Sequence, residues 1–158
     1  DGVAHYNDVK GTSVEVLGLD TFLGSFDDPA LARAAAETQL AAGADILLPA
    51  AGDAALGAAD AILDAGNALI VGVDTDMYLS SPEYGSIVLT SITKNLDAAV
   101  FALVKQVHDG TFDGSDYVGT LANGGVGLAP FHDLDGEVPE SLKEELAALA
   151  GDVSKRKE

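Results

Sequence analysis

The sequence predicts an α/β fold in which a parallel sheet carries helices on both faces, so that the domain has three layers. Apolar runs of strand length alternate with Ala-rich segments of helix length along the whole chain. Several of these runs are apolar without alternation, which is typical of strands buried on both faces. Glycines stand where most of the elements should end, as expected for chain reversals. Together these observations favour parallel strands joined by helices.

The expected elements follow one another in a regular order. The chain opens on the end of a helix, which is followed by a short alternating strand and then by two helix–strand pairs. A further strand, a long helix, a strand region broken by glycines, a last helix and a charged tail complete the order. The residue ranges are 1–11, 13–20, 24–44, 45–50, 52–67, 68–74, 85–91, 92–110, 115–131, 139–150 and 155–157.

The helix ends have recognisable signals. Asp27 or Asp28 can cap the helix of 24–44, and Pro29 fits its first turn. Gly43 and Gly66 stand where the first two Ala-rich helices should stop. The long helix is amphipathic, and its apolar residues fall on one stripe. That stripe consists of Leu96, Val100, Leu103, Val104 and Val107.

Composition limits the class of protein. The 158 residues are enough for one domain with a core, and 26 acids against 8 bases give a formal net charge of −18. Such a surface repels nucleic acid and anionic membranes. We interpret it as a surface adapted to high salt, with a cluster of cation sites as the alternative. The lack of cysteine excludes disulfides, thiol catalysis and Cys-based zinc sites.

No targeting or membrane segment is visible in these residues. No apolar run approaches the roughly 20 residues of a membrane span, and no signal peptide can be recognised. The chain has no initiating Met and begins within an element, so this observation says little about its compartment.

Polar side chains follow three of the expected strands. In open α/β sheets, ligands bind beyond the carboxyl ends of the strands. The three exits read LPAAGDAALG, VGVDTDMY and VLTSITK, and we expect them to form one rim. The residues that they offer are Gly52, Asp74, Asp76, Thr90, Ser91 and Lys94.

Two carboxylates at the end of an apolar strand call for an explanation. Asp74 and Asp76 could be metal ligands, a catalytic pair, or acceptors for ligand hydroxyls. A neutral, hydroxyl-rich ligand suits them, because carboxylates accept strong hydrogen bonds from a diol. The alternative is a turn in which Asp bonds its own backbone. Lys94 at a helix start opposes the helix dipole, so it either points into a shared cleft and pairs with Asp74 or is simply solvated.

Catalytic and metal motifs are not recognisable. His5, His108 and His132 lack ligand spacing, and each is interpreted as structural. Ser91 has no glycine-framed elbow and no neighbouring His. No combination of nucleophile, base and oxyanion donors emerges, so we expect a protein that is not an enzyme and needs neither a cofactor nor a metal.

Four motifs resemble one protein family. GSFDDPALARAAAETQLAAGADILLPAAGDAALGAADA, VGVDTDMY, VLTSITKNLDAAVF and GGVGLAPF occur in the order found in the basic membrane protein family. These are substrate-binding lipoproteins of ABC transporters, and they include bacterial purine-nucleoside receptors. The resemblance spans about residues 10–140. It implies a type I periplasmic-binding-protein fold, with ligand held between two lobes. Residues 1–158 resemble the second lobe with its returning C-terminal segment, so the first lobe is missing from this chain.

The resemblance implies roles for particular residues. Asp74 matches the family Asp that accepts hydrogen bonds from ribose hydroxyls, and Lys94 matches the Lys that joins it. Gly52 matches the glycine that opens the segment after the preceding strand, and Asp76 is the second acid of the family pattern D-x-D-Q. Met77 departs from that pattern, because Gln is usual there. No aromatic residue precedes Gly52, where family members often place a stacking ring.

The resemblance also implies a function. We expect the solute-binding component of an ABC importer that binds a nucleoside, most simply a purine nucleoside, through its ribose hydroxyls and without catalysis. The implied partners are the nucleoside or a related small molecule and the transporter permease, with no nucleic acid. The implied location is the cell surface or the periplasmic side of the membrane, reached only through a lipid anchor outside this chain. Two alternatives are a ligand-sensing domain of a transcription regulator with the same fold, and an α/β enzyme that processes sugars.

Overall fold

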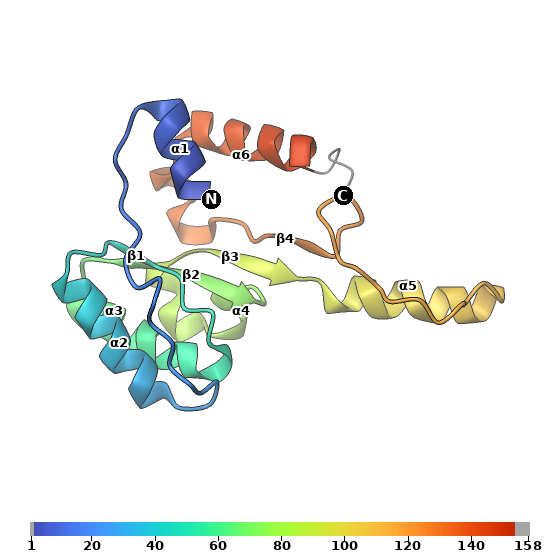
Figure 1. The fold of residues 1–158 in the computed structure, drawn as a ribbon, viewed down its shortest axis with the longest axis horizontal. Helices are drawn as coiled ribbons and strands as arrows, with labels where there is room; N and C mark the ends of the chain where they lie inside the picture. Colours follow the sequence, from blue (N-terminus) through green and yellow to red (C-terminus); the bar gives the residue numbers. More distant parts are fainter. Residues whose placement is uncertain (1, 154–158) are drawn as a thin grey trace.

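The computed structural model describes residues 2–153 and contains one four-stranded sheet with helices on both sides (Figure 1). The sheet order is β1-β2-β3-β4, with β1, β2 and β3 parallel and β4 antiparallel to β3. The α/β prediction is confirmed, except that the sheet is mixed, because the chain returns beside β3. The expected charged tail at 155–157 lies outside the described residues. The strands are β1 (Ile46–Leu47), β2 (Leu69–Asp74), β3 (Val88–Lys94) and β4 (Val126–Leu128).

Six α-helices and three short 3₁₀ segments surround this sheet in the described part of the chain. Figure 1 shows α2, α3 and α4 on one side of the sheet, and α1 beside α6 on the other. Lys10 of α1 and Glu145 of α6 form an ion pair at 2.5 Å. The helices are α1 (Gly2–Lys10), α2 (Pro29–Ala41), α3 (Ala55–Ala65), α4 (Met77–Ser80), α5 (Leu96–Asp109) and α6 (Glu140–Val153). The 3₁₀ segments are η1 (Gly52–Ala54), η2 (Pro82–Ile87) and η3 (His132–Glu137).

The start of α2 and the end of α3 follow their sequence signals, whereas both helices are shorter than the predicted ranges 24–44 and 52–67. The Asp28 side chain accepts from the Ala30 amide at 3.0 Å and so caps α2, which begins at Pro29. Gly66 ends α3 in the left-handed conformation, at φ 68°. The two helices pack through small side chains, which lets their backbones come close together. The buried residues of this interface and of the layer beneath it include Ala32, Ala36, Ala58, Ala59 and Ala61.

The core lies between α3 and strands β2 and β3. Ile62 and Ile70 are fully buried, and Val88 is almost so. The central strands are apolar on both faces, as predicted, because helices or connecting segments cover each face. This packing fixes the carboxyl ends of β2 and β3 beside each other, with Asp74 in register with Thr93.

The predicted strand at 13–20 is wrong. These residues lie outside every helix and strand, and several of their apolar side chains are exposed. The Asn7 side chain forms hydrogen bonds with both backbone groups of Val14. Its Nδ2 donates to the Val14 carbonyl at 2.8 Å, and its Oδ1 accepts from the Val14 amide at 2.9 Å. The segment then passes close to α2, because a β-carbon on Gly18 would overlap the Gln39 amide. An alternating pattern forms a strand only where a partner strand is available.

Other boundaries also differ from the prediction. The strand predicted at 45–50 is reduced to β1, and the strand predicted at 85–91 begins later, because η2 occupies the residues up to Ile87. β3 then continues to Lys94, because both β2 and β4 pair with its last residues, so the helix predicted over 92–110 is shortened at its start. Only β4 forms within the glycine-broken region 115–131.

Helix α5 projects away from the sheet (Figure 1). It contains no buried residue. Within its predicted apolar stripe, Val100, Val104 and Val107 are 60%, 62% and 63% exposed. The amphipathic pattern of α5 is therefore real, but nothing in residues 2–153 buries its apolar side.

A buried hydrogen bond ties η2 to α3 and makes stability depend on pH. Tyr84 is 8% exposed, and its hydroxyl donates to Asp60 Oδ1 at 2.7 Å. This bond to a carboxylate raises the pKa of Tyr84 to about 12, with burial as the second cause. The folded state therefore holds the phenol proton more tightly than the unfolded chain, where tyrosine titrates near pH ~10. The stabilisation is complete below that pH and is lost as the pH rises towards about 12.

We expect Tyr84→Phe to lower the free energy of unfolding by about 1–2 kcal/mol near pH ~8, because the variant lacks the bond to Asp60. The difference between variant and wild type should shrink as the pH rises above about 10. Urea unfolding of the variant and the wild type below and above the usual pKa of tyrosine measures this difference. A difference that stays constant with pH would show that the phenol proton is not involved.

None of the helices in residues 2–153 combines the length and the apolarity needed to cross a bilayer.

Candidate functional site

Asp74 and Lys94 meet at the carboxyl ends of β2 and β3. Lys94 Nζ lies 2.6 Å from Asp74 Oδ1, and the two side chains are 61% and 47% exposed. Oδ1 itself is covered by its surroundings and accepts no aligned hydrogen bond from a described residue. The predicted meeting of these two residues is confirmed, although Lys94 ends β3 and does not open the following helix. Because Oδ1 is covered, the pair offers the other carboxylate oxygen, Oδ2, as the acceptor for a ligand, with the neighbouring cation holding the group.

The end of β2 is shaped by a close approach to β3. A β-carbon on Gly72 would lie 2.5 Å from Ser91 Oγ and 2.7 Å from Met77 Cβ, so the chain has room only for glycine there. Ser91 Oγ also accepts from the Met77 amide at 3.0 Å. Asp74 leaves the strand at φ 77°, a conformation that residues other than glycine adopt at a cost in energy. The surrounding contacts hold the backbone of Asp74 in this unfavourable conformation, as is common at binding sites.

A cavity of about 360 Å³ lies beside Asp74, at the carboxyl ends of β1 and β2. Gly52 and Asp53 contribute to it from η1, and Thr75 and Ser80 contribute hydroxyl groups. Two predicted site residues, Gly52 and Asp74, therefore line one cavity. Its wall holds two carboxylates, and Lys94 is the cation in contact with one of them. This balance favours a neutral or cationic ligand over an anionic one.

An exposed aromatic ring also lies at this rim. Phe26 is 69% exposed. Its carbonyl accepts from the Ala54 amide at 2.9 Å, and a β-carbon on Gly52 would lie 3.7 Å from Phe26 Cδ1. Gly52 has φ 57° and lines the cavity, so Phe26 lies next to a residue of the cavity wall without lining the cavity itself. No aromatic residue immediately precedes Gly52 in the sequence, and the spacing of motifs did not predict that Phe26 lies beside it. The available signal was an aromatic residue just ahead of a helix cap, in GSFDDP.

Asp76 faces away from this cavity, towards the C-terminal segment. Its Oδ1 accepts from the Tyr78 amide at 3.2 Å and so caps α4, and its Oδ2 lies 2.8 Å from His132 Nε2. Both carboxylate oxygens thus have partners. A direct contact of Asp76 with a ligand stays a prediction.

Thr90 and Ser91 do not lie on the rim, contrary to expectation. Both are buried within β3, at 7% and 0% exposure. Thr90 Oγ1 donates to the Ala129 carbonyl at 2.7 Å, and Ser91 Oγ serves the Met77 amide. Because β3 continues to Lys94, Thr90 and Ser91 lie inside the strand and not at its carboxyl end. Their hydroxyls form structural hydrogen bonds to neighbouring segments.

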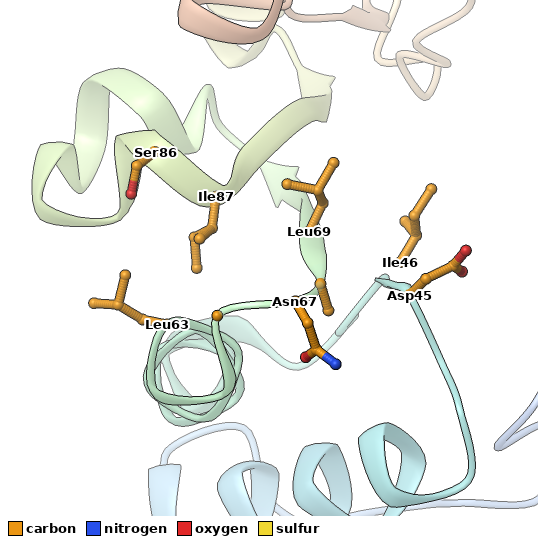
Figure 2. Close-up of a pocket in the computed structure, with 9 residues that line it drawn as sticks. Asp45, Ile46, Leu63, Asn67, Leu69, Ser86 and Ile87 are labelled. Carbon is orange, nitrogen blue, oxygen red and sulfur yellow. The ribbon is translucent and has the colours of Figure 1, made fainter. Parts of the chain in front are cut away.

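A larger hollow of about 620 Å³ lies at the opposite ends of the strands. Figure 2 shows Leu63, Leu69 and Ile87 around it, with Asp45 at its margin. Apart from Asp45, its walls consist of apolar and uncharged polar residues, so it offers few groups that could orient a ligand. We therefore place the candidate site at Asp74 and Lys94. Within residues 2–153, no group of three or more His, Asp or Glu side chains is arranged to hold a metal ion.

Comparison with known proteins decides the family. The sequence model of the family described as "ABC transporter substrate-binding protein PnrA-like" matches residues 2–157. The chain belongs to this family. Uncharacterized lipoproteins of Pyrococcus abyssi and Pyrococcus horikoshii are each 32% identical to it over 140 residues, which is 85% of this chain and 33% of the relative. The chain therefore spans about a third of the length of these lipoproteins.

Solved structures agree with this assignment. An ABC transporter solute-binding protein from Aeropyrum pernix K1 is 27% identical with a TM-score of 0.71, over 98% of this chain and 48% of that one. A solute-binding protein of the same kind from Conexibacter woesei is 26% identical with a TM-score of 0.66, over 85% and 43%. A transcriptional activator of the comK gene from Bacillus halodurans, 20% identical with a TM-score of 0.73 over 84% and 44%, shares the fold alone.

Proposed function

We propose that this chain is the nucleoside-binding lobe of a solute-binding protein that serves an ABC importer. The observation that carries the proposal is the Asp74–Lys94 ion pair at the open carboxyl edge of the sheet. A carboxylate accepts two hydrogen bonds from a cis-diol, and an adjacent ammonium fixes its orientation and donates to the same sugar. Binding leaves the ligand chemically unchanged.

The size and the charge of the cavity support a small neutral ligand. Its volume of about 360 Å³ falls within the range of small-molecule sites. Its two carboxylates, on a chain with a net charge of −18, disfavour a phosphate group. A nucleoside has the hydroxyls but lacks the phosphate, whereas a nucleotide has both.

Phe26 would provide a surface for the base. Its exposed ring, next to Gly52 of the cavity wall, can stack on any base, since every base has a π face. In this proposal the sugar lies against Asp74 and Lys94, and the base extends past Gly52 towards Phe26. Stacking of this kind tolerates different bases, so Phe26 favours a nucleoside without selecting one.

We propose further that residues 1–158 form one lobe of a two-lobed protein. The uncovered apolar stripe of α5 supports this, because a second lobe would bury it. The Pyrococcus lipoproteins are about three times as long as the aligned region, which leaves room for such a lobe. The relatives' description as lipoproteins supports a lipid-anchored protein at the outer side of the membrane, with the transporter permease as its partner.

The alternative of a ligand-sensing domain in a transcription regulator has weaker support. It rests on a likeness of fold to the Bacillus halodurans activator at 20% identity. The net charge of −18 would also oppose close approach to DNA.

Titration with matched ligands tests the proposal. Adenosine, guanosine and inosine are added to the ¹⁵N-labelled chain, together with their 2′-deoxy forms and their 5′-monophosphates. We expect amide shifts at Asp74 and Lys94 with the ribonucleosides, and affinities about tenfold or more lower for both sets of analogues, since each lacks or disturbs one charged contact. Equal binding of ribo- and deoxyribonucleosides would contradict the role of Asp74. The spectrum of the recovered nucleoside, unchanged if the protein only binds, separates binding from catalysis.

A further inference from the structure

Four side chains form a connected group on the far side of the Asp74 turn. His132 Nε2 lies 2.8 Å from Asp76 Oδ2, and each of these two side chains is only 18% exposed. The His132 ring stacks on Tyr78, with ring centres 4.1 Å apart and planes 8° from parallel. The Asp133 carboxylate acts on the Tyr78 hydroxyl and raises the pKa of Tyr78. We call Asp76, Tyr78, His132 and Asp133 the His132 clamp.

The His132 clamp joins two segments that are far apart in the sequence. Asp76 and Tyr78 lie in the turn after β2, where Asp76 caps α4 and Tyr78 belongs to α4. His132 and Asp133 belong to η3, which follows β4. The start of the second segment is fixed to β3 by two buried hydrogen bonds. The Ala129 amide donates to the Ser91 carbonyl at 2.8 Å, and its carbonyl accepts from Thr90 Oγ1 at 2.7 Å. His132 therefore reaches the turn from a rigid base three residues away.

Backbone strain marks both ends of this connection. Among residues 2–153, the non-glycine residues with positive φ are Asp74, at 77°, and His132, at 45°. Such conformations persist only where the surrounding structure imposes them, and they gather at ligand-binding positions. Here they lie on either side of Asp76: one is two residues before it along the chain, and the other is bonded to its carboxylate. The bond between His132 and Asp76 thus links the two strained positions.

We propose that His132 is a positioning residue for the binding site, which acts through Asp76 to hold the Asp74 carboxylate in its ligand-accepting orientation. The proposal rests on the proposed function for its biological meaning. Asp76 then acts as the connector between His132 and the turn, and the C-terminal segment becomes part of the support of the site. The imidazole N–H donated to Asp76 is the essential contact, and the stacked ring is secondary.

Two substitutions separate the hydrogen bond from the ring. Gln places its amide nitrogen near the position of imidazole Nε2, so His132→Gln keeps a donor for Asp76 but loses the ring. His132→Phe keeps the ring but has no donor. Both replacements are non-glycine residues and bear a backbone cost at φ 45°, as His132 does. His108→Ala is the control, because His108 is 86% exposed at the end of α5, away from the His132 clamp.

The readouts are the amide chemical shifts of Asp74 and Thr75 and the affinity for guanosine, inosine and adenosine. We expect His132→Phe to shift both amides and to weaken nucleoside binding by about tenfold or more. His132→Gln should stay within about threefold of wild type, and His108→Ala should match it. Unchanged amides of core residues such as Ile62 establish that each variant is folded.

Two results would overturn the proposal. In one, His132→Phe leaves the Asp74 and Thr75 amides and the affinity as in wild type. In the other, His132→Gln and His132→Phe perturb the site equally, which would assign the role to the ring. If the wild-type chain binds none of the nucleosides, the proposed function fails, and the amide shifts of the two variants still decide whether His132 positions Asp74.

Discussion

Replacing Asp74 with alanine is expected to reduce nucleoside affinity by about 10- to 150-fold. This range corresponds to the roughly 1.5–3 kcal/mol that a hydrogen bond to a charged group contributes. The loss follows from the geometry of the pair, because Asp74 is the accessible acceptor and Lys94, 2.6 Å away, would remain as an uncompensated donor. Calorimetric or NMR titration of the variant with guanosine, inosine and adenosine measures the change.

Replacing Asp74 should weaken nucleoside binding but can increase the stability of the folded chain. Asp74 has φ 77°, which glycine adopts without strain. Asp74→Gly is therefore expected to raise the free energy of unfolding by up to about 1 kcal/mol, while it removes binding as Asp74→Ala does. A residue that lowers stability and raises affinity is a residue kept for function.

Asp64 provides the matched control. It is also an exposed acid paired with a cation, Arg33 Nη2 at 2.5 Å, but it belongs to the α2–α3 side of the molecule. Asp64→Ala should leave nucleoside affinity unchanged. If Asp74→Ala and Asp64→Ala bind nucleosides equally well, Asp74 is not the sugar acceptor.

The site could be predicted from sequence to the extent that strand direction determines it. Asp74 and Lys94 follow adjacent parallel strands, so the carboxyl ends of those strands had to bring them to one edge. The arrangement that places Asp74 Oδ1 2.6 Å from Lys94 Nζ depends on β3 continuing to Lys94, and Lys94 itself pairs with Val126 of β4. The sequence of β3 alone contains no sign of this pairing, because residues 126–128 are distant in the chain.

The contacts that were missed are long-range as well. His132 is separated from Asp76 by more than fifty residues, and no spacing rule connects them. Phe26 reaches Gly52 through a loop whose path is not encoded by periodicity. Local signals such as the Asp28 cap and the Gly66 stop predicted the start of α2 and the end of α3, because each acts within one turn of helix.

Residues 13–20 and α5 also show that a local sequence pattern does not determine long-range contacts. Both have a clear apolar pattern, and both leave that pattern exposed in residues 2–153. A pattern records which face of an element should be buried, but the burial itself requires a partner. The two uncovered patterns are consistent with the chain spanning about a third of its relatives' length.

The largest expected effect on folding comes from Gly57, at the contact between α2 and α3. A β-carbon there would overlap the carbonyl oxygen of Pro29 and lie 2.9 Å from its Cα. The obstacle is backbone at the first residue of α2, so no side-chain rotation can make room for the added methyl group. We expect Gly57→Ala to lower the free energy of unfolding by about 3 kcal/mol, the upper part of the usual range for overpacking. That is a large share of the 5–15 kcal/mol of a typical domain.

Gly151→Ala is the matched control for this prediction. Gly151 also lies inside a helix, α6, but a β-carbon there would meet nothing within 4 Å. Its replacement should stabilise the chain by about 0.5–1 kcal/mol, since alanine favours helix over glycine. Urea unfolding of both variants measures the two changes, and they should have opposite signs. Changes of the same sign and size would mean that helices α2 and α3 do not approach each other through Gly57.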